Sequence, residues 1–323
     1  MSVYRVGVIG LGIMGRRMVQ RMGDHGRFKV VAGWDPSADA VALAADLAPG
    51  LEAAEGPEAL VARGDLDLLY IASPPRFHMA QATLAVDRGL PVLCEKPLAV
   101  DLAEAAAMVA RVEGGGHRAA VNYVLASAPA ILAMGRMIAK GDIGAVRGAA
   151  VSVGFREWPR PWQQGAASWL AGRAEGGFTR EVASHFLFAL RRLLGPLEVI
   201  QATVGWPADP ALSERDLMAT LTAGGVGVHL SGHVGRIAAD DKNEMVVTGD
   251  RGALRLVDWR HLEMADRGGW KPVREAKDMA GPGMAQLDAV AAWLEGGPHP
   301  LASFREALDV QACVEEMLAG VED

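Results

Sequence analysis

The sequence predicts an α/β chain of two domains, the first built on a parallel sheet and the second on a largely antiparallel open sheet. Over the first 120 or so residues, short apolar strands alternate with alanine-rich helices, which is typical of a parallel sheet covered on both faces. Longer strands then follow one another across short turns, which is typical of antiparallel pairing. This change predicts a boundary near residue 122, giving domains 1–122 and 123–323.

The elements follow from apolar runs and from the glycines and prolines between them. In the first domain we expect strands near 3–9, 28–34, 67–72, 91–94 and 118–122, and helices near 37–47, 76–88 and 101–113. The second domain is expected to begin with a helix at 129–140, a strand at 145–156, a tryptophan- and proline-rich loop at 158–169 and a strong helix at 179–194. Strands near 197–206, 216–223, 226–236, 243–249, 252–257 and 260–265 and helices near 283–296 and 303–319 complete the chain.

The composition excludes several classes of protein. A net charge of −7 and a pI near 5.7 argue against a nucleic-acid-binding surface or an anionic-membrane binder. No apolar run approaches the roughly 18–20 residues that span a bilayer, and the first residues lack a signal-peptide pattern. Cys94 and Cys313 are too few for a disulfide framework or a thiolate metal site, and we expect both to be buried and reduced. We therefore expect a cytoplasmic protein without a metal.

A glycine-rich turn predicts a dinucleotide site near the N-terminus. Gly10, Gly12 and Gly15 form G-x-G-x-x-G, with Ile13 and Met14 between the last two, directly after an apolar strand and at the start of a helix. In the Rossmann fold such glycines allow a tight turn, close approach of the pyrophosphate and close packing of the helix on the strand. Amides at the helix N-terminus would bind the pyrophosphate. The alternative is an ordinary βα turn without a ligand.

Asp35 predicts which dinucleotide is bound. It closes the second apolar run, 20 residues after Gly15 (35 − 15). A carboxylate there suits the ribose hydroxyls and repels a 2′-phosphate, and the neighbouring Pro36, Ser37 and Ala38 offer no arginine to reverse that preference. We therefore expect NAD rather than NADP.

Two further turns are expected at the same edge of the sheet. The turn containing Ser73, Pro74 and His78 would pack on the cofactor, or be a βα turn without a ligand. At the end of the next strand stands Glu95-Lys96-Pro97, and a charged pair there is costly unless it is paired or functional. Lys96 would stabilise negative charge on a substrate oxygen. The alternative for Lys96 is a lysine of a surface loop.

A second group of candidate catalytic residues is expected on the helix at 179–194. Glu181 and His185 follow Gly176-Gly177 and are four residues apart, so they share one helix face. The carboxylate would orient the imidazole, and His185 would accept or return a hydroxyl proton. Taken alone, such a pair is also compatible with a surface ion pair.

These motifs, in this order, resemble the glucose–fructose oxidoreductase/inositol dehydrogenase/MocA (Gfo/Idh/MocA) family over essentially the whole chain. The resemblance implies a Rossmann domain and a C-terminal domain whose open sheet commonly forms homodimer or homotetramer contacts. It implies catalytic roles for Lys96 and His185, with Glu181 in the place of the usual aspartate. It also implies cofactor binding by the following residues: Gly10, Gly12, Gly15, Asp35, Pro74, His78 and Glu95. Ala183 replaces the usual glycine of the helix motif. Phe188 stands where many members of the family place an aspartate, so polar contacts to the substrate are expected to be fewer.

The expected function is reversible hydride transfer between nicotinamide and a carbinol carbon of a sugar, cyclitol or related polyol. Two alternatives are an NAD-dependent glycosidase of the same fold and a non-enzymatic nicotinamide-binding regulator. Trp158, Trp162 and Trp169 would stack on a sugar ring, plug the core or form an oligomer contact.

Overall fold

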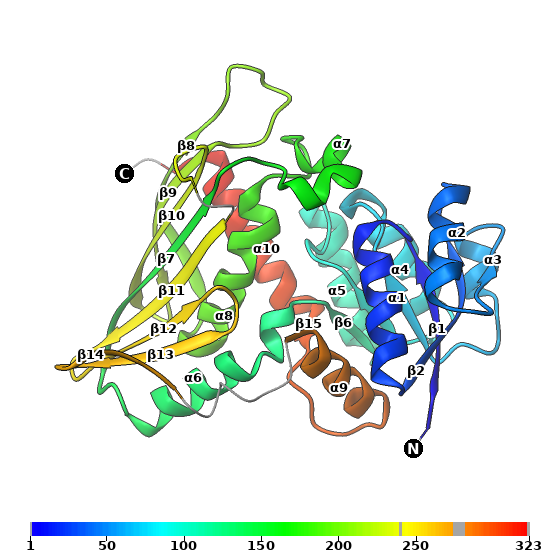
Figure 1. Cartoon of the computed structure of the whole chain (residues 1–323), viewed down its shortest axis with the longest axis horizontal. Helices are drawn as coiled ribbons and strands as arrows, with labels where there is room; N and C mark the ends of the chain where they lie inside the picture. Colours follow the sequence, from blue (N-terminus) through cyan, green and yellow to red (C-terminus); the bar gives the residue numbers. More distant parts are fainter. Residues whose placement is uncertain (1, 239–240, 274–281, 322–323) are drawn as a thin grey trace. The chain divides into compact units, whose positions relative to one another are not determined.

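The computed structural model describes residues 2–238, 241–273 and 282–321, and the chain divides into two compact units (Figure 1). The first unit comprises Met1–Tyr123 and Gln286–Leu308. The second comprises Val124–Ala285 and Asp309–Asp323. From the sequence we expect Gln286–Leu308 in the second domain, whereas the contacts in the structure group this segment with the first unit.

The first unit contains the predicted parallel sheet. Its strands are β1 (Tyr4–Ile9), β2 (Phe28–Trp34), β3 (Glu52–Ala53), β4 (Leu68–Ile71), β5 (Val92–Cys94), β6 (Ala119–Val121) and β15 (Ala302–Ser303). They lie in the order β15-β6-β5-β4-β1-β2-β3, and all neighbours pair in parallel except β15, which runs antiparallel to β6. The middle strands are buried along their length, so their apolar residues form the core.

The helices of the first unit form two groups. They are α1 (Ile13–His25), α2 (Ala38–Leu47), α3 (Pro57–Val61), α4 (His78–Val86), α5 (Leu102–Gly115) and α9 (Pro282–Leu294). α1 packs beside α2, and α4 packs between α3 and α5, as expected for a sheet covered on both faces. Local sequence sets their ends: Asp101 Oδ1 accepts hydrogen bonds from the first amides of α5, and α1 ends at Gly26 in the left-handed region.

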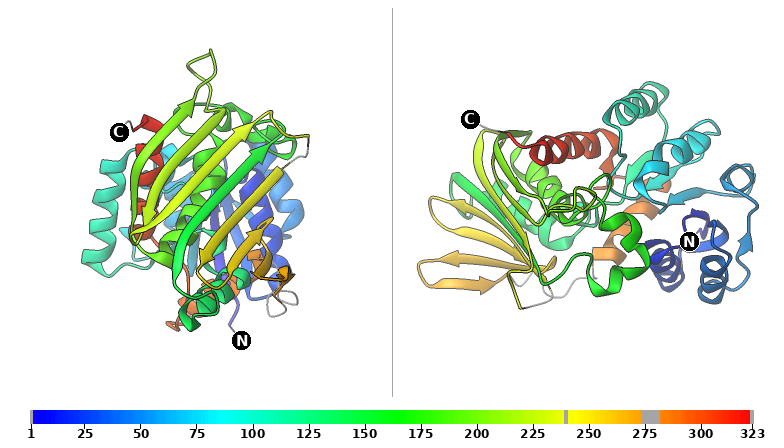
Figure 2. Two further views of the ribbon diagram at one scale, coloured as in Figure 1. Left: turned by 90° about the vertical axis from the view of Figure 1, so that its left-hand side faces the viewer. Right: turned by 90° about the horizontal axis from the view of Figure 1, so that it is seen from above.

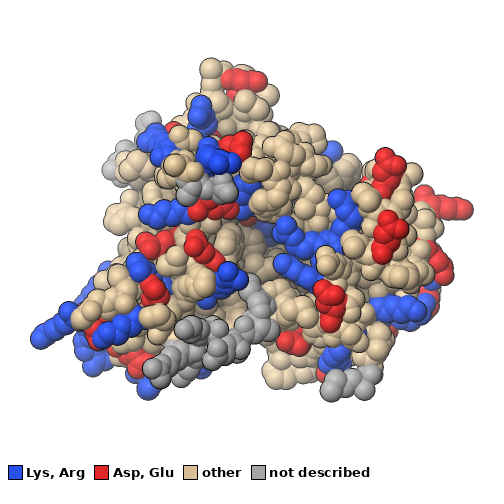
Figure 3. All heavy atoms as spheres, in the orientation of Figure 1, with Lys and Arg blue, Asp and Glu red and all other residues tan. Residues whose placement is uncertain are grey.

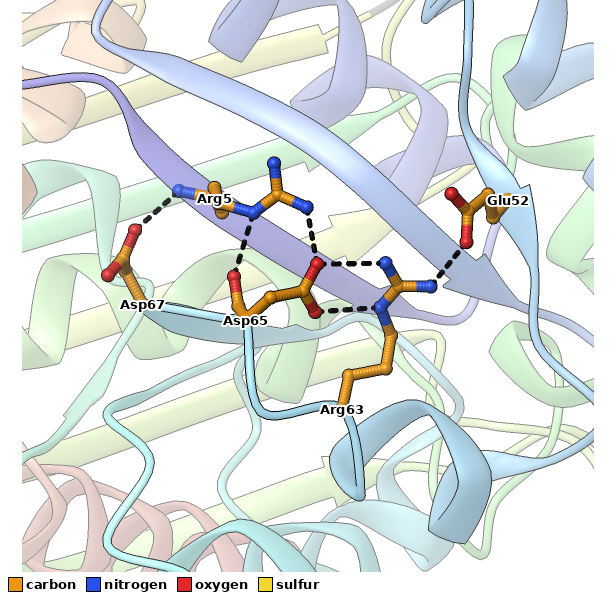
Figure 4. A network of polar contacts seen from close by, with 5 residues as sticks. All are labelled: Arg5, Glu52, Arg63, Asp65 and Asp67. Carbon is orange, nitrogen blue, oxygen red and sulfur yellow. Dashed lines mark hydrogen bonds and ion pairs between the residues drawn. The ribbon is translucent and has the colours of Figure 1, made fainter.

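An ion-pair network lies at the amino ends of β1 and β4, on the opposite edge of the sheet from the glycine turn (Figure 4). Arg63 contacts both carboxylate oxygens of Asp65 at 3.0 Å and Glu52 at 2.5 Å. Arg5 pairs with Asp65 as well, and its amide donates to Asp67 at 2.7 Å. Hydrogen bonds from Arg63 and Arg5 lower the pKa of Asp65 to about 2. The network ties the loop before β4 to β1 and β3.

The second unit contains an eight-stranded sheet that is antiparallel except at one pair. Its strands are β7 (Val146–Phe155), β8 (Leu197–Gly205), β9 (Asp216–Ala223), β10 (Val226–Val234), β11 (Asp241–Gly249), β12 (Ala253–Val257), β13 (His261–Asp266) and β14 (Gly269–Pro272). The order is β14-β13-β12-β11-β7-β10-β9-β8, and β7 pairs with β10 in parallel. Among the residues that the structure describes, no helix covers one face of this sheet, as the left view of Figure 2 shows. The predicted open and largely antiparallel sheet is confirmed.

Helices lie against the other face of this sheet (Figures 1 and 2). They are α6 (Pro129–Lys140), α8 (Ser184–Leu194) and the end of α10 (Phe304–Ala319), while the short helix α7 (Ala167–Leu170) follows β7 in the chain. α6 begins at a proline and ends before Gly141, whose φ is 77°, so its predicted bounds are confirmed. α8 packs on β9 and α6 on β12 and β13.

On the face shown in Figure 3, basic and acidic side chains are interspersed among the described residues.

Candidate active site

The three glycines of the first turn differ in what surrounds them. Gly10 has a φ of 86°, and a Cβ there would lie 2.5 Å from the Ala72 carbonyl carbon and the Ser73 nitrogen. A Cβ on Gly15 would lie 1.9 Å from the Gly10 oxygen, whereas a Cβ on Gly12 would meet nothing within 4 Å. Backbone packing thus requires glycine at positions 10 and 15. At Gly12, glycine leaves open space.

That open space lies at the N-terminus of α1. Gly12 is the N-cap residue; it makes no side-chain cap, and the first turn of α1 contains no acidic residue. Ile13 and Met14, which begin the helix, are half-buried. The first amides of a helix have no intrahelical partner and carry partial positive charge, so they favour an anion. The turn therefore fits a dinucleotide pyrophosphate.

Asp35 connects the glycine turn to the end of β2. Its Oδ2 accepts a hydrogen bond from the Leu11 amide at 2.8 Å, and its Oδ1 accepts one from the Ser37 amide at 2.9 Å. Each carboxylate oxygen has two lone pairs, so this half-buried group keeps acceptor capacity for hydroxyls. Asp35 has a structural function that the sequence analysis missed, because the contact with Leu11 spans 24 positions.

His78 connects the loops that follow β4 and β5. Its Nε2 lies 2.8 Å from the Ser73 carbonyl oxygen, and its Nδ1 lies 2.9 Å from the Pro97 carbonyl oxygen. The ring is fully buried, and this burial lowers the pKa of His78. Ser73 Oγ donates to Gln81 at 2.7 Å, and Pro74 is half-buried beside it. Both ring nitrogens of His78 thus face main-chain carbonyl oxygens, and a neutral ring donates its single N–H to one of them, so His78 lies between the two loops and links one of them to α4.

Glu95 lies in a buried polar group at the carboxyl ends of three neighbouring strands. Its Oε1 accepts hydrogen bonds from the Tyr70 hydroxyl at 2.5 Å and from Asn122 Nδ2 at 2.6 Å. Burial raises the pKa of the Tyr70 hydroxyl well above its usual value, so this hydroxyl is a donor. The Lys96 amide lies 3.3 Å from Glu95 Oε2, and the Lys96 side chain is half-buried. Neighbouring strands thus fix the backbone from which Lys96 projects.

In the second unit, the helix that carries Glu181 and His185 begins with a π-helical segment. We expected one regular helix over 179–194, but Thr179–Ala183 is π-helical and α8 begins at Ser184. The Ser184 amide donates to the Thr179 carbonyl, five residues back, while Ser184 Oγ donates to the Arg180 carbonyl at 2.6 Å. The hydroxyl takes the carbonyl that the amide would use in an α-helix. Such insertions are frequent at functional sites.

Gly176 and Gly177 precede this segment, and their lack of a side chain lets the backbone pack closely against the Leu170 carbonyl and the Glu214 carboxylate. A Cβ on Gly176 would lie 2.3 Å from the Leu170 carbonyl oxygen. Gly177 has a φ of 99°, and a Cβ there would lie 2.2 Å from Glu214 Oε2. Glu214 Oε1 accepts hydrogen bonds from the Thr179 amide at 2.8 Å and the Thr179 hydroxyl at 2.7 Å. Burial raises the pKa of Glu214. The sequence analysis missed Glu214, which lies far along the chain in a loop before β9.

His185 lies within an aromatic group of the second unit. The residue is 5% exposed, whereas Glu181 is half-buried. The Trp259 ring lies 5.1 Å from the His185 ring, with an interplanar angle of 84°. Ala183 and Phe188, the two departures from the family pattern on this helix, are fully buried. The sequence analysis missed Trp259, because the turn that presents it lies far along the chain from His185.

The tryptophan- and proline-rich loop has two kinds of tryptophan. Trp158 packs on Phe155 and Phe178 with ring centroids 5.1 and 6.4 Å apart, and its Nε1 donates to the Leu170 carbonyl at 3.1 Å. Trp162 is 43% exposed and lies over a guanidinium, that of Arg160. Trp158 is therefore a half-buried residue that packs on two aromatic rings of the core, whereas Trp162 is exposed at the surface of its unit.

The expected site residues thus occur in two sets. The first unit brings the following residues to the carboxyl edge of β1, β2, β4 and β5: Gly10, Gly12, Gly15, Asp35, Ser73, Pro74, Glu95 and Lys96. The second unit carries Glu181 and His185 on one helical segment. Within the ranges that the structure describes, no helix is both long and apolar enough to cross a membrane.

Two family models match the chain and together cover more than half of it. The model described as "Oxidoreductase family, NAD-binding Rossmann fold" matches residues 4–123, and "GFO/IDH/MocA C-terminal domain" matches residues 131–255. The first match lies within the first unit and the second match lies within the second unit.

Individual proteins show the same likeness. Inositol 2-dehydrogenase 1 of Saccharopolyspora erythraea is 35% identical over 143 residues, which cover 43% of this chain and 42% of that protein. The chain thus matches less than half the length of this relative. D-apiose dehydrogenase of Paraburkholderia graminis is 26% identical over 329 residues, covering 97% of this chain and 86% of that protein.

A solved structure shares the fold over nearly the full length. An oxidoreductase from Agrobacterium radiobacter in complex with NAD+, L-tartaric acid and magnesium superposes with a TM-score of 0.83 at 19% identity. The superposition covers 98% of this chain and 97% of that one. The two family models, which match residues 4–123 and 131–255, show that the chain belongs to the Gfo/Idh/MocA family of oxidoreductases.

Proposed function

We propose that this protein is an NAD(P)-dependent oxidoreductase that transfers a hydride between nicotinamide and a carbinol carbon of a sugar, cyclitol or related polyol. The observation that carries the proposal is the open turn at Gly12, which lies at the same edge of the sheet as Lys96. Ligands of such sheets bind at the carboxyl ends of the strands. The names of the relatives, an inositol dehydrogenase and an apiose dehydrogenase, support a polyol or sugar as substrate.

The residues of the glycine turn would hold the cofactor. The amides of Ile13 and Met14 would bind the pyrophosphate, and Asp35 would accept hydrogen bonds from the ribose hydroxyls. We propose NAD rather than NADP, because the Asp35 carboxylate would lie close to a 2′-phosphate and repel it. When bound, the nicotinamide supplies the carbon that accepts or returns the hydride.

Three side chains would act on the substrate. During oxidation the carbinol carbon loses a hydride and its oxygen loses a proton, so that a carbonyl forms. His185 accepts that proton, and Glu181 orients the imidazole. Lys96 donates a hydrogen bond to the oxygen and stabilises the charge that develops on it. In the reverse direction His185 returns the proton.

The open face of the eight-stranded sheet is the surface that we propose for self-association into a homodimer or homotetramer. Met218 lies on this face and is 70% exposed, so its side chain would be covered in such an assembly. Light scattering at several protein concentrations would measure the mass, and a monomer throughout would contradict this assembly.

Alanine variants test the catalytic assignment. In a polyol and sugar screen that follows NADH absorbance, His185→Ala and Lys96→Ala should each lower turnover about 100-fold or more. His117→Ala and Lys140→Ala are matched controls, because His117 precedes β6 at its amino end and Lys140 lies on the last turn of α6. Near-normal rates in both test variants would overturn the assignment. Turnover without net NADH, by an enzyme that retains its cofactor during purification, would favour the glycosidase instead.

A further inference from the structure

The hairpin between β12 and β13 contains a strained turn. Asp258 and Trp259 have φ values of 47° and 69° and are the only non-glycine residues with positive φ in the described part of the chain. The Arg260 amide donates to the Val257 carbonyl at 3.3 Å, closing the turn around these two residues. Turns with positive φ at both central positions normally use Asn-Gly, and a bulky residue there is an outlier. Such strain persists only where the surroundings hold it, and it clusters at functional sites.

Two sets of contacts hold this turn. The Asp258 amide donates to the Asn243 carbonyl at 3.0 Å, which ties the turn to β11. The Trp259 ring lies 5.1 Å from the Phe186 ring at an interplanar angle of 36° and 5.1 Å from the His185 ring at 84°. The indole therefore rests on two consecutive residues of α8. Phe186 is fully buried, so it gives the indole a rigid support.

We propose that Trp259 is a positioning residue for His185, an inference that rests on the proposed function. A histidine on a helix can rotate about its Cβ–Cγ bond, and only some orientations present a ring nitrogen to a substrate hydroxyl. A ring packed perpendicular to the imidazole restricts that rotation from one side. The strained turn fixes where the indole lies. The hairpin thus acts on the reaction through its contact with His185.

A substitution by glycine at position 259 tests the effect of the indole without disturbing the backbone of the turn. Trp259→Gly removes the indole but suits a φ of 69°, so the turn should still form. Trp259→Phe keeps a ring in the same place. Trp270→Ala is the matched control, because Trp270 lies on β14 of the same sheet and packs on Arg255, with the guanidinium 4.3 Å from the ring centroid.

Kinetics give the first measurement. We expect Trp259→Gly to lower kcat about 10-fold or more, because small misplacements of a catalytic group are costly, while the KM for NAD+ stays unchanged. Trp259→Phe should restore most of the lost kcat, and Trp270→Ala should match the wild type. A wild-type kcat in Trp259→Gly would overturn the proposal.

A spectroscopic measurement tests the same inference without turnover. Loss of the indole ring current shifts the imidazole C–H signals of His185 in any case, so the line width is the readout. These signals, identified by their loss in His185→Asn, should broaden in Trp259→Gly but not in Trp259→Phe or Trp270→Ala, and unchanged line widths in Trp259→Gly would overturn the positioning role even if the wild-type enzyme is active. If no polyol is oxidised by the wild type but the His185 signals change as expected, the proposed function fails and the positioning of His185 stands.

Discussion

Glu214 accepts two hydrogen bonds from Thr179, one from its amide and one from its hydroxyl, at 2.8 and 2.7 Å. Thr179 begins the segment that leads to Glu181 and His185. A buried carboxylate from a loop far along the chain thus holds the start of the helix that carries the proposed acid–base residue. A carboxylate at this end of a helix also suits the helix dipole.

Removing the Glu214 side chain should destabilise the fold. In Glu214→Ala the Thr179 amide would lose its buried acceptor, which should cost about 2 kcal/mol in free energy of unfolding. Glu214→Gln keeps an oxygen acceptor and should cost less. Urea denaturation of both variants checks the order, and equal losses would show that the hydrogen bonds to Thr179 do not matter.

Glu214 should also make the stability depend on pH. Burial raises the pKa of Glu214, so the folded protein keeps this proton at pH values where the unfolded chain has released it. The free energy of unfolding contributed by this group is therefore full below the usual carboxyl pKa and falls as the pH rises through the raised pKa. Glu214→Gln lacks that decline. Urea denaturation at a series of pH values would measure the difference, and parallel curves for the two proteins would contradict the shift.

The glycines of the first turn should respond differently to alanine. Gly12→Ala should fold with nearly unchanged stability, because its Cβ meets no atom within 4 Å, but the methyl should occupy the space of the pyrophosphate. Gly15→Ala should lose about 1–3 kcal/mol of stability, because its Cβ would collide with the Gly10 oxygen. Thermal denaturation and titration with NADH separate the two effects. Tight NADH binding by Gly12→Ala would contradict the placement of the cofactor.

Asp35 should set the preference between the two dinucleotides. Asp35→Asn removes the negative charge but keeps an oxygen that can accept from the Leu11 amide. We expect NAD+ binding to weaken and the ratio of NADP+ to NAD+ affinity to rise about 10-fold, or about 1.4 kcal/mol. Calorimetric titration with each dinucleotide measures this ratio, and an unchanged ratio would place the ribose away from Asp35.

The ion-pair network around Asp65 should contribute only modestly to stability. The hydrogen bonds that Asp65 accepts from Arg63 and Arg5 lower the pKa of Asp65 to about 2. The stabilisation that Asp65 contributes to the fold is therefore present above the usual aspartate pKa and is lost as the pH falls through about 2. Because these side chains are largely exposed, Asp65→Asn should cost no more than about 1 kcal/mol at neutral pH. The cost should vanish in acid, and a pH-independent difference in urea denaturation would contradict this cause.

The elements whose bounds the sequence predicts correctly have turn residues, proline or glycine at their ends. β2 and β9 match their expected ranges, because each is an apolar or alternating run between turn residues. α6 matches because a proline and a glycine mark its ends. β3, α3, β14 and β15 were not predicted, since each is too short to show a period.

The remaining misses depend on tertiary contact. The parallel pairing of β7 with β10 follows from the order of strands in the sheet, which local sequence does not encode. Glu214 and Trp259 gain their roles from contact with residues far away in the chain, and no motif marks them. By contrast, the glycine turn, Lys96 and the Glu181/His185 pair were found because each belongs to a short motif.

The pairing of β15 with β6 has a consequence for how the protein is made. Ala302 and Ser303 cover β6, the last parallel strand of the first sheet, but they follow the whole of Val124–Ala285 in the chain. During synthesis the backbone groups along that edge of β6 are therefore exposed until Val124–Ala285 and the residues up to Ser303 have left the ribosome. Exposed strand edges invite pairing with other chains, so nascent chains should need protection for most of their synthesis.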